Sequence, residues 1–505
     1  MPTALVLRRT SVAALATATA LTLAVSAPAT AKGHHGPQHP NPAHGHHPGP
    51  PLAPRTHFTM APDGSSGLTA GGAGIPNIDS VKSTIRAYYG ASSSGISNKV
   101  SSPYISEMHA IEAQALASLP TVDPAAKKAI VFDADDTTLW TYDMEDNAMH
   151  FNFDPALQNV WVQNALFPAS PGMVDFEHAV QAKGYAVFGI TGRNSGQEAA
   201  TLTNLSNVGY TGFDADNFYT KWTSAEPVPA YVDCSADGNA ASCSTVEYKA
   251  FTRKHIEDSG YDIVLNVGDQ FSDLQGGYAD RALKLPNPTY YLPSPDIAGA
   301  PASDADLTPR THFTMKPDGS SGLTEGGEGI PNIDSVKSTI RTYYNAPSSG
   351  PDTGIANKDT SPYISEMRHV TRSNTHRLVN QCRQELRRGG SPAIVFDADD
   401  TTLWTYDMED GAMRFNFDPT VQDTDWVQPQ KFPATPGMVG LVNAVGHAGC
   451  AVVGLTGRRV NQRDATLGNL TKVGYTAFTP ELYFTKWASN ATPDPAIYAG
   501  TPCEN

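Results

Sequence analysis

Apolar positions in the first half of the chain follow two alternating patterns. Some form short continuous runs typical of buried strands, and others recur every three to four residues, as on one face of a helix. The predicted strands are Ile130–Phe132, Tyr185–Ile190 and Ile263–Val267, and the predicted helices are Met173–Lys183, Gln197–Val208 and Val246–Ser259, with a further helix marked by Ile78, Val81 and Ile85. Strands that alternate with helices predict an α/β fold, a parallel sheet flanked by helices.

The same pattern then occurs a second time. The stretch "AIVFDADDTTLWTYDMED" stands at Ala129–Asp146 and again, letter for letter, at Ala393–Asp410. Around it, "PRTHFTM", "GIPNIDSVKSTIR", "PYISEM", "FNFDP", "PGMV", "TGR" and "TKW" return in the same order. A period this long indicates a duplicated domain and not a solenoid. We therefore predict two tandem modules.

The second copy is shorter than the first. It has no counterpart of "VEYKAFTRKHIEDSGYDIVLNVGDQFSDLQGG", which carries a predicted helix and a predicted strand. Without that strand, its sheet would have an exposed edge. The Arg-rich stretch Arg368–Gly390 also differs between the copies, but Leu378, Cys382 and Leu386 keep helical spacing and predict a helix.

The N-terminal segment has the features of an export signal. Arg8 and Arg9 precede the apolar run Ser11–Val25, and Ala29-Thr30-Ala31 fits the small-residue rule for cleavage after Ala31. The run is too short and interrupted for a good membrane span, although an uncleaved anchor is the alternative. We predict a secreted protein with no membrane attachment after cleavage, and both Sec and twin-arginine export stay open.

These features divide the chain into five parts. They are a signal peptide at 1–31, a His-, Pro- and Gly-rich disordered segment at 32–54, a complete module at 55–292, a linker at 293–309 and an incomplete module at 310–505. The His-rich segment is predicted to be a solvated spacer, with metal capture as the alternative.

Net charge limits the partners that the chain is expected to bind, and the cysteines indicate the redox compartment in which it folds. The chain has 505 residues and a formal net charge of -16, which argues against nucleic acid or an anionic membrane as a partner. Cys234 and Cys243 bracket a polar loop and are predicted to form a disulfide in an oxidising compartment. Cys382 and Cys450 lie in apolar patterns and are predicted to be buried thiols.

Polar residues gather directly after the predicted strands. They are Asp133, Asp135, Asp136 and Thr137 after the first, Thr191 after the second, and Asp269 and Asp273 after the third, with Lys249 in the helix before it. Ligands of open α/β sheets bind at this edge. Close carboxylates stay ionised only beside a cation, and oxygen ligands favour Mg²⁺. A carboxylate nucleophile, a second carboxylate as acid and base, and a Lys and a Thr on phosphoryl oxygens together predict phosphoryl transfer through a covalent intermediate.

Four of these motifs resemble those of a known superfamily. "DADDT", "TGR", the lysine of "YKAFTRKHI" and "GDQFSDL" are similar to the four motifs of the haloacid-dehalogenase (HAD) superfamily. "DDTTLW", "FNFDP", "FPASPGM" and "GDQFSDLQGG" resemble, more narrowly, its secreted acid phosphatases of subfamily IIIB, the class B and plant-type group. The likeness covers residues 55–292, and residues 310–490 without the last two motifs. It implies a HAD-like Rossmannoid sheet without a large mobile cap, and an open site for small phosphomonoesters.

The resemblance also implies a role for each motif residue. Asp133 would be the nucleophile and Asp135 the general acid and base. Mg²⁺ would be held by Asp133, by the backbone carbonyl of Asp135 and by Asp269, with Asp273 in support. The phosphate-binding residues would be Thr137, which orients the nucleophile loop, Thr191 and Lys249. Arg193 is assigned only a surface or packing role.

Each assignment has a simpler alternative. Asp133 and Asp135 could belong to a solvated turn or a calcium loop, and Thr191 could cap the next helix. Lys249 could be a surface lysine, and Asp273 only a charge at a helix N-terminus.

Two other functional classes compete with a phosphatase. Class II terpene cyclases also use an Asp-x-Asp-Asp motif, but they are all-helical, whereas a strand-like run enters the motif here. A secreted, non-catalytic storage or binding protein could keep the same fold, but the retained Asp133 favours the enzyme.

The expected function is thus a secreted, Mg²⁺-dependent acid phosphatase that hydrolyses phosphomonoesters through an aspartyl phosphate in the first module. The second copy keeps Asp397, Asp399, Thr401 and Thr456. It has no counterpart of Lys249 or Asp269, and we predict it to be inactive.

Overall fold

The computed structural model describes residue 67 and residues 74–298 and 329–487. The predicted signal peptide and His-rich segment, and most of the predicted linker, lie outside the described residues. None of the helices in the described ranges combines the length and apolar character needed to cross a membrane.

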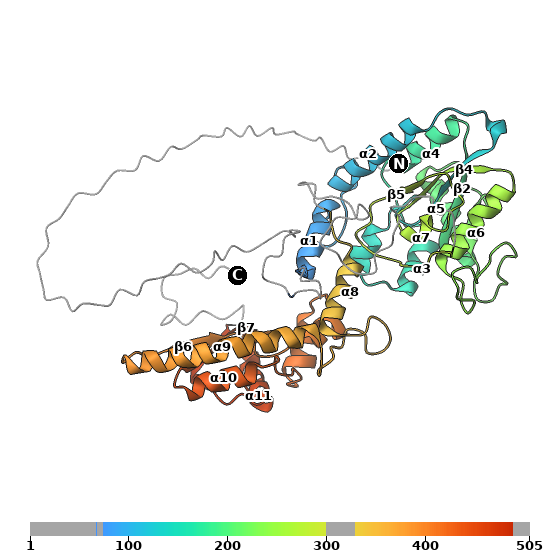
Figure 1. Ribbon diagram of the computed structural model, residues 1–505. Coiled ribbons are helices and arrows are strands. Elements are labelled where there is room, and N and C mark those ends of the chain that lie inside the picture. Colours follow the sequence, from blue (N-terminus) through green and yellow to red (C-terminus); the bar gives the residue numbers. More distant parts are fainter. Residues whose placement is uncertain (1–66, 68–73, 299–328, 488–505) are drawn as a thin grey trace, which may run out of the picture. The chain divides into compact units, whose positions relative to one another are not determined.

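The first copy forms a five-stranded parallel sheet in the order β3-β2-β1-β4-β5, surrounded by helices (Figure 1). The strands are β1 (Lys128–Phe132), β2 (Ala186–Asn194), β3 (Phe218–Lys221), β4 (Asp262–Gly268) and β5 (Ala282–Lys284). The helices are α1 (Ile78–Tyr88), α2 (Pro103–Ser118), α3 (Pro155–Gln163), α4 (Met173–Ala182), α5 (Glu198–Val208), α6 (Thr245–Asp258) and α7 (Phe271–Leu274). The α/β fold predicted from the sequence is confirmed.

The predicted elements of this copy are all present, with one shifted boundary that matters for the site. The strand predicted to end at Ile190 continues to Asn194 and so contains Thr191 and Arg193. Its pairing with β3 is interrupted after Ile190 and resumes where Asn194 meets Lys221. This irregularity lengthens the strand past the point where its apolar run stops.

Residues of β1 alternate between two apolar cores. Ile130 and Phe132 lie in the core on the side of α4, and Ala129 and Val131 lie in the core on the side of α6. Each face of the sheet is therefore covered by a helix layer, as a parallel sheet requires. The central strand is buried on both faces, and its C-terminal end delivers the acidic motif.

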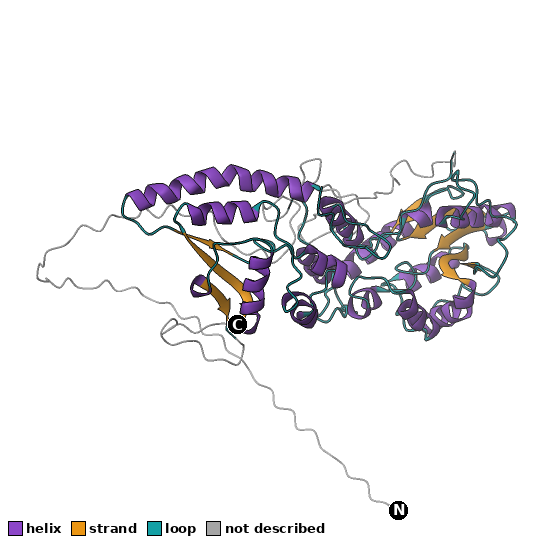
Figure 2. Cartoon of the chain, turned by 90° about the horizontal axis from the view of Figure 1, so that it is seen from below, coloured by secondary structure: helices purple, strands orange, loops and turns teal. Residues whose placement is uncertain are grey.

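The second copy repeats only part of this architecture. Its sheet has three parallel strands in the order β6-β7-β8, with the long helix α9 beside it (Figure 2). The elements are α8 (Ile333–Tyr344), α9 (Pro362–Arg387), β6 (Ala393–Phe396), α10 (Met438–His447), β7 (Ala451–Arg459), α11 (Arg463–Lys472) and β8 (Tyr483–Lys486). Among the described residues nothing pairs with the free side of β6, so the predicted exposed edge is confirmed.

In the part of the second copy that the structure describes, no helix corresponds to α6, and the sheet face that α6 covers in the first copy carries exposed apolar side chains. Val395 and Leu455 are 57% and 56% exposed. Their counterparts in the first copy, Val131 and Ile190, are 1% and 2% exposed. The same apolar positions thus serve as core in one copy and as surface in the other.

The cysteine prediction was wrong in one respect. Cys234 and Cys243 form a disulfide across the polar loop before α6. Cys382 and Cys450, predicted to be separate buried thiols, form a second disulfide that joins α9 to the start of β7. Their apolar surroundings indicate burial, but no local pattern indicates that two such positions face each other.

The two sheet faces predict different responses to one isosteric substitution. Val131→Thr buries a hydroxyl among apolar side chains and should lower the free energy of unfolding of the first module by about 1–3 kcal/mol. The matched Val395→Thr places the hydroxyl in solvent and should change stability by less than about 0.5 kcal/mol. Urea unfolding of the full chain measures both. Equal losses would show that the second face is also covered.

Candidate functional site

The site is built where the chain changes direction across the sheet. From β1 the chain adds β2 and then β3 on one side, and α6 returns it to β4 on the other side of β1. Such a switch point leaves a crevice beyond the carboxyl ends of the two central strands. Phe132 pairs with Gly189 on β2 and with Val267 on β4, so these three residues lie at one level of the sheet. Residues that follow these three positions therefore converge.

Three carboxylates meet in this crevice. One oxygen each from Asp133, Asp269 and Asp273 lies within 4.8 Å of the others, and all three side chains are buried. Burial raises the pKa of Asp133, against the opposing charge of Lys249. Burial, followed by the charges of Asp273 and Asp136, raises the pKa of Asp269 to about 7. Asp133 and Asp269 therefore hold their protons more tightly than free carboxylates do, and a cation bound beside them would favour the ionised forms.

Lys249 supplies one positive charge. Its Nζ lies 2.6 Å from Asp133 Oδ1 and 2.6 Å from Asp273 Oδ1. Burial alone would lower the pKa of Lys249, but the two carboxylates more than offset this effect and raise it. The helix that carries Lys249, α6, begins at a capping box between Ser244 and Glu247, which sets its first turns against the site. Lys249 is therefore a buried member of the cluster and not a surface lysine.

The donor set fits a hard divalent cation. Three carboxylates lie close together while the Lys249 ammonium pairs with only two of them, Asp133 and Asp273, and their oxygens are the ligands that Mg²⁺ or Ca²⁺ prefers. Asp135 is predicted to contribute its backbone carbonyl to the metal, and this stays a prediction; its carboxylate is not part of the cluster.

Asp269 is held from three sides. Its Oδ2 accepts hydrogen bonds from Asn287 Nδ2 at 2.6 Å and from Gln270 Nε2 at 2.7 Å. The Thr137 hydroxyl donates to Oδ1 at 3.5 Å. Thr137 thus contacts Asp269, and its predicted role in orienting the nucleophile loop stays a prediction. Asn287, which follows β5, was not predicted to belong to the site.

Asp136 shapes the loop after β1. Its φ of 49° lies in the left-handed region, which Asp tolerates, and Asp400 repeats this conformation. The Asp136 carboxylate accepts hydrogen bonds from the Thr141 amide at 2.9 Å and the Thr141 hydroxyl at 2.5 Å. It also accepts one from Asn287 at 3.3 Å. These bonds fix the turn from which Asp133 and Asp135 project.

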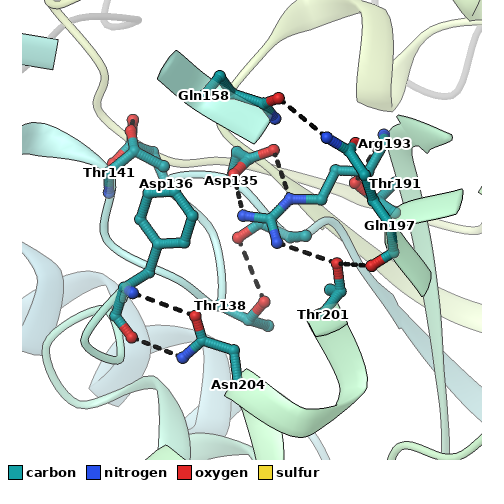
Figure 3. Close-up of polar contacts among 12 residues, drawn as sticks. Asp135, Asp136, Thr138, Thr141, Gln158, Thr191, Arg193, Gln197, Thr201 and Asn204 are labelled. Atoms are coloured by element: carbon teal, nitrogen blue, oxygen red, sulfur yellow. Dashed lines mark hydrogen bonds and ion pairs between the residues drawn. The ribbon is translucent and has the colours of Figure 1, made fainter. Parts of the chain in front are cut away.

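The Asp135 side chain points toward Arg193 (Figure 3). The Arg193 guanidinium donates to both of its oxygens, at 2.5 Å and 3.1 Å. It also donates to the Thr201 hydroxyl at 3.0 Å, and its charge lies over the Phe167 ring. The prediction that Arg193 has only a surface or packing role was wrong, because its buried side chain fixes the direction of Asp135. The signal was available, since "TGR" returns unchanged in the second copy.

Thr191 lies on β2, two residues past the pairing level. Its hydroxyl accepts a hydrogen bond from the Arg193 amide at 3.2 Å, and its side chain is buried. It thus bonds within its own strand and does not cap the following helix.

The second copy keeps one half of this arrangement. Arg458 holds Asp399 as Arg193 holds Asp135, with a shortest distance of 2.6 Å, and Thr456 accepts the Arg458 amide at 3.2 Å. Asp397 is exposed and Thr401 is half-buried. In the described parts of the chain, the only cluster of three potential metal ligands is that of the first copy. The missing half is the one that α6 and β4 would supply.

Comparison with known families agrees with this geometry. Residues 91–293 and 355–492 match the family described as HAD superfamily, subfamily IIIB (acid phosphatase). The chain belongs to this family. The two matched blocks correspond to the two modules, and membership supports acid phosphatase activity in this chain.

Curated relatives of this subfamily IIIB chain include both enzymes and storage proteins. The chain is 28% identical to the stem 28 kDa glycoprotein of Glycine max over 37% of its own length and 70% of that protein. It is 28% identical to acid phosphatase 1 of Solanum lycopersicum over 33% of its own length and 63% of that protein. It is 27% identical to vegetative storage protein 2 of Arabidopsis thaliana over 33% of its own length and 61% of that protein. The chain thus spans somewhat less than two thirds of the length of the last two.

Among solved structures, a class C acid phosphatase from Bacillus anthracis is similar to this subfamily IIIB chain. The likeness covers 42% of this chain and 86% of that one, with 18% identity and a TM-score of 0.30.

The carboxylate cluster predicts a specific role for Lys249 in stability. Lys249→Met leaves buried carboxylates without a partner and should lower the free energy of unfolding by about 3 kcal/mol or more in EDTA. Mg²⁺ should stabilise the variant more than the wild type, because the ion then replaces the missing charge. Urea unfolding with and without Mg²⁺ measures both effects.

Lys254→Met is the control for this experiment. Lys254 lies on the same helix in an exposed pair with Asp258, so the change should cost less than about 0.5 kcal/mol. If both variants lost the same stability, Lys249 would not be the cation that the cluster requires.

Proposed function

We propose that this chain is a secreted, Mg²⁺-dependent acid phosphatase that hydrolyses phosphomonoesters through an aspartyl phosphate, with its active site in the first module. The observation that carries the proposal is the cluster of Asp133, Asp269 and Asp273 at the switch point of the sheet, in which the buried Lys249 ammonium pairs with Asp133 and Asp273. A structural core gains nothing from three buried carboxylates, whereas phosphoryl transfer uses each of them.

Asp133 is the proposed nucleophile. Its carboxylate attacks phosphorus, a bond forms between the Asp133 oxygen and phosphorus, and the bond from phosphorus to the ester oxygen breaks. Lys249, 2.6 Å from Asp133, is placed to hold a phosphoryl oxygen and to offset the charge that develops on it. Thr191, from the neighbouring strand, is the proposed second contact to the phosphate.

Asp133, Asp269 and Asp273 are the residues that would hold Mg²⁺. Bound there, the ion would neutralise charge on the phosphoryl group and orient it toward Asp133. Asn287, Gln270 and Thr137 keep Asp269 in place for this purpose.

Asp135 is the proposed general acid and base. It gives its proton to the leaving ester oxygen, and it then takes a proton from the water that attacks the phosphoenzyme and releases phosphate. The two bonds from Arg193 fix the direction of the carboxylate, which makes Arg193 a positioning residue.

The alternative is a storage or binding protein with the same fold, a class that occurs among the relatives. The complete set of proposed catalytic residues in the first copy favours the enzyme over this alternative. A class II terpene cyclase is excluded by the parallel α/β sheet. The two disulfides support the proposed export, because such bonds persist in oxidising compartments.

Hydrolysis of p-nitrophenyl phosphate tests the proposal directly. Asp133→Asn should reduce turnover to background because it removes the nucleophile, and EDTA should do the same until Mg²⁺ is added back. Asp397→Asn, the same change in the identical motif of the second copy, should leave turnover unchanged. If activity survived Asp133→Asn but were lost in Asp397→Asn, the active site would lie in the second copy and the proposal would be wrong.

Substitution of Arg193 tests the role given to Asp135. Arg193→Gln should lower kcat about 10- to 100-fold, because a misdirected general acid no longer reaches the leaving oxygen. The loss should be greater for phenyl phosphate than for p-nitrophenyl phosphate, whose leaving group needs little protonation. Arg458→Gln should have no effect on either substrate. A uniform loss on both substrates would indicate a role for Arg193 in folding alone.

A further inference from the structure

The N-terminal helix of each copy, α1 in the first and α8 in the second, makes contacts with the other copy. Lys337, at the start of α8 in the second copy, donates to the Phe151 carbonyl and to Asn152 Oδ1 of the first. Lys82, at the matching position of α1, donates to the Phe415 carbonyl of the second copy and to Asn416 Oδ1. Each copy thus gives the other the same contact, as in a two-fold symmetric dimer.

Apolar packing and further polar contacts follow the same exchange. Ile333 and Val336 of the second copy are fully buried in the core cluster of the first, and Ile75 of the first copy lies in a cluster of the second. Asn152 Nδ2 donates to the Arg414 carbonyl at 3.1 Å, and Asn416 Nδ2 donates to the His150 carbonyl at 3.1 Å. The two modules are therefore packed as subunits and not merely linked.

The segment Asn332–Asp334, here called the clamp segment, grips a loop of the first copy. That loop, residues 287–292, follows β5 and is called the site loop. Asn332 Nδ2 donates to the carbonyls of Asn287 at 3.1 Å and Tyr290 at 2.6 Å. The Ile333 amide donates to the Pro288 carbonyl at 2.9 Å.

A fourth bond closes the other end of the site loop. The Tyr291 amide donates to Asp334 Oδ2 at 3.2 Å. The clamp segment thereby satisfies backbone groups along most of the site loop, which has no regular secondary structure of its own.

The site loop in turn holds the proposed metal ligands. Asn287 donates to Asp269 at 2.6 Å and to Asp136 at 3.3 Å. Gln270, which also donates to Asp269, accepts the Leu292 amide at 3.0 Å. A short hydrogen-bonded path therefore runs from the second copy through the site loop to Asp269.

The matching segment of the first copy does not hold a loop of this kind among the described residues of the second copy. Asn77–Asp79 has the same letters as the clamp segment and lies against the second copy, whose described residues include no counterpart of the site loop. There it lines a cavity of about 660 Å³ together with Tyr344, Asp400 and Glu409. Among the described residues, the Asn77 side chain makes only the bonds that cap α1. Among the described residues, the clamp segment of the second copy therefore holds a loop of the first, whereas Asn77 of the first copy holds no loop of the second.

We propose that the second copy is a tethered subunit whose clamp segment positions Asp269 in the active site of the first copy. The proposal rests on the proposed function, since it assigns a purpose to a copy that has no complete site of its own. It makes Asn332 and Asp334 positioning residues for a site more than forty positions away along the chain.

The duplicated sequence supplies a matched pair of variants for the test. Asn332→Ser in the full chain removes the donors to the site loop, while Ser still caps α8. Asn77→Ser makes the same change at α1, where no site loop exists. Titration calorimetry with Mg²⁺ should show weaker binding for Asn332→Ser, on the order of tenfold, as expected when one or two hydrogen bonds no longer hold the loop. Asn77→Ser should bind Mg²⁺ like the wild type.

A second variant and a second readout guard against a folding artefact. Asp334→Ala should also weaken Mg²⁺ binding, and Asp334→Asn, whose side-chain oxygen can still accept the Tyr291 amide, should restore it. Amide hydrogen exchange in residues 287–292 should be faster in Asn332→Ser than in Asn77→Ser, whether or not the protein hydrolyses phosphate. Equal exchange and equal Mg²⁺ binding in the matched pair would overturn the tethered-subunit proposal. Loss of hydrolysis is not part of that criterion, so a failed phosphatase assignment is recognised separately by an inactive wild type.

Discussion

Repulsion among buried carboxylates is the constraint around which the first module is organised. Asp133, Asp269 and Asp273 come from two strand ends and a short helix, and none of them is stable there without a nearby cation. Lys249 meets that requirement only because α6 crosses from one side of β1 to the other and places its first turns in the crevice. Helix α6, the connection that creates the crevice, therefore also carries the positive charge that stabilises the buried carboxylates there. One crossover connection thus determines both the strand order of the sheet and the charge balance of the site.

The second module shows what remains when that connection is lost. Its counterparts of β1, β2 and β3 still form a parallel sheet, and the pair of Arg458 and Asp399 is still in place. Within the described residues, however, no strand lies on the far side of β6, so the three-stranded sheet they form has no switch point. The motif letters are identical in the two copies, so the difference between a site and a surface turn comes entirely from elements distant in sequence.

This dependence on distant elements explains what could be predicted from the sequence. The rule that parallel strands end at one edge was enough to bring Asp133 and Asp269 together, and helical periodicity was enough to place Lys249 near them. The partner of Arg193 was missed because nothing in "TGR" indicates which carboxylate its side chain will face. Asn287 was missed because it follows the three-residue strand β5, which has no clear apolar pattern. The disulfide of Cys382 and Cys450 joins positions 68 residues apart, and apolar context at each one carries no pairing information.

The exchange of helix contacts also sets an order of events during synthesis. Lys82 and the carbonyl that it meets are 333 positions apart, so α1 is made long before its target on the second copy exists. Lys337 meets a carbonyl made 186 positions earlier, so α8 leaves the ribosome with its docking site already present. Because α1 and α8 share the sequence "IDSVKSTIR", a first copy that waits with an unpaired α1 can be joined by α8 of its own chain or of another. The covalent tether favours the first outcome through local concentration. Covalent linkage of the two copies therefore works against chains that assemble with each other's modules.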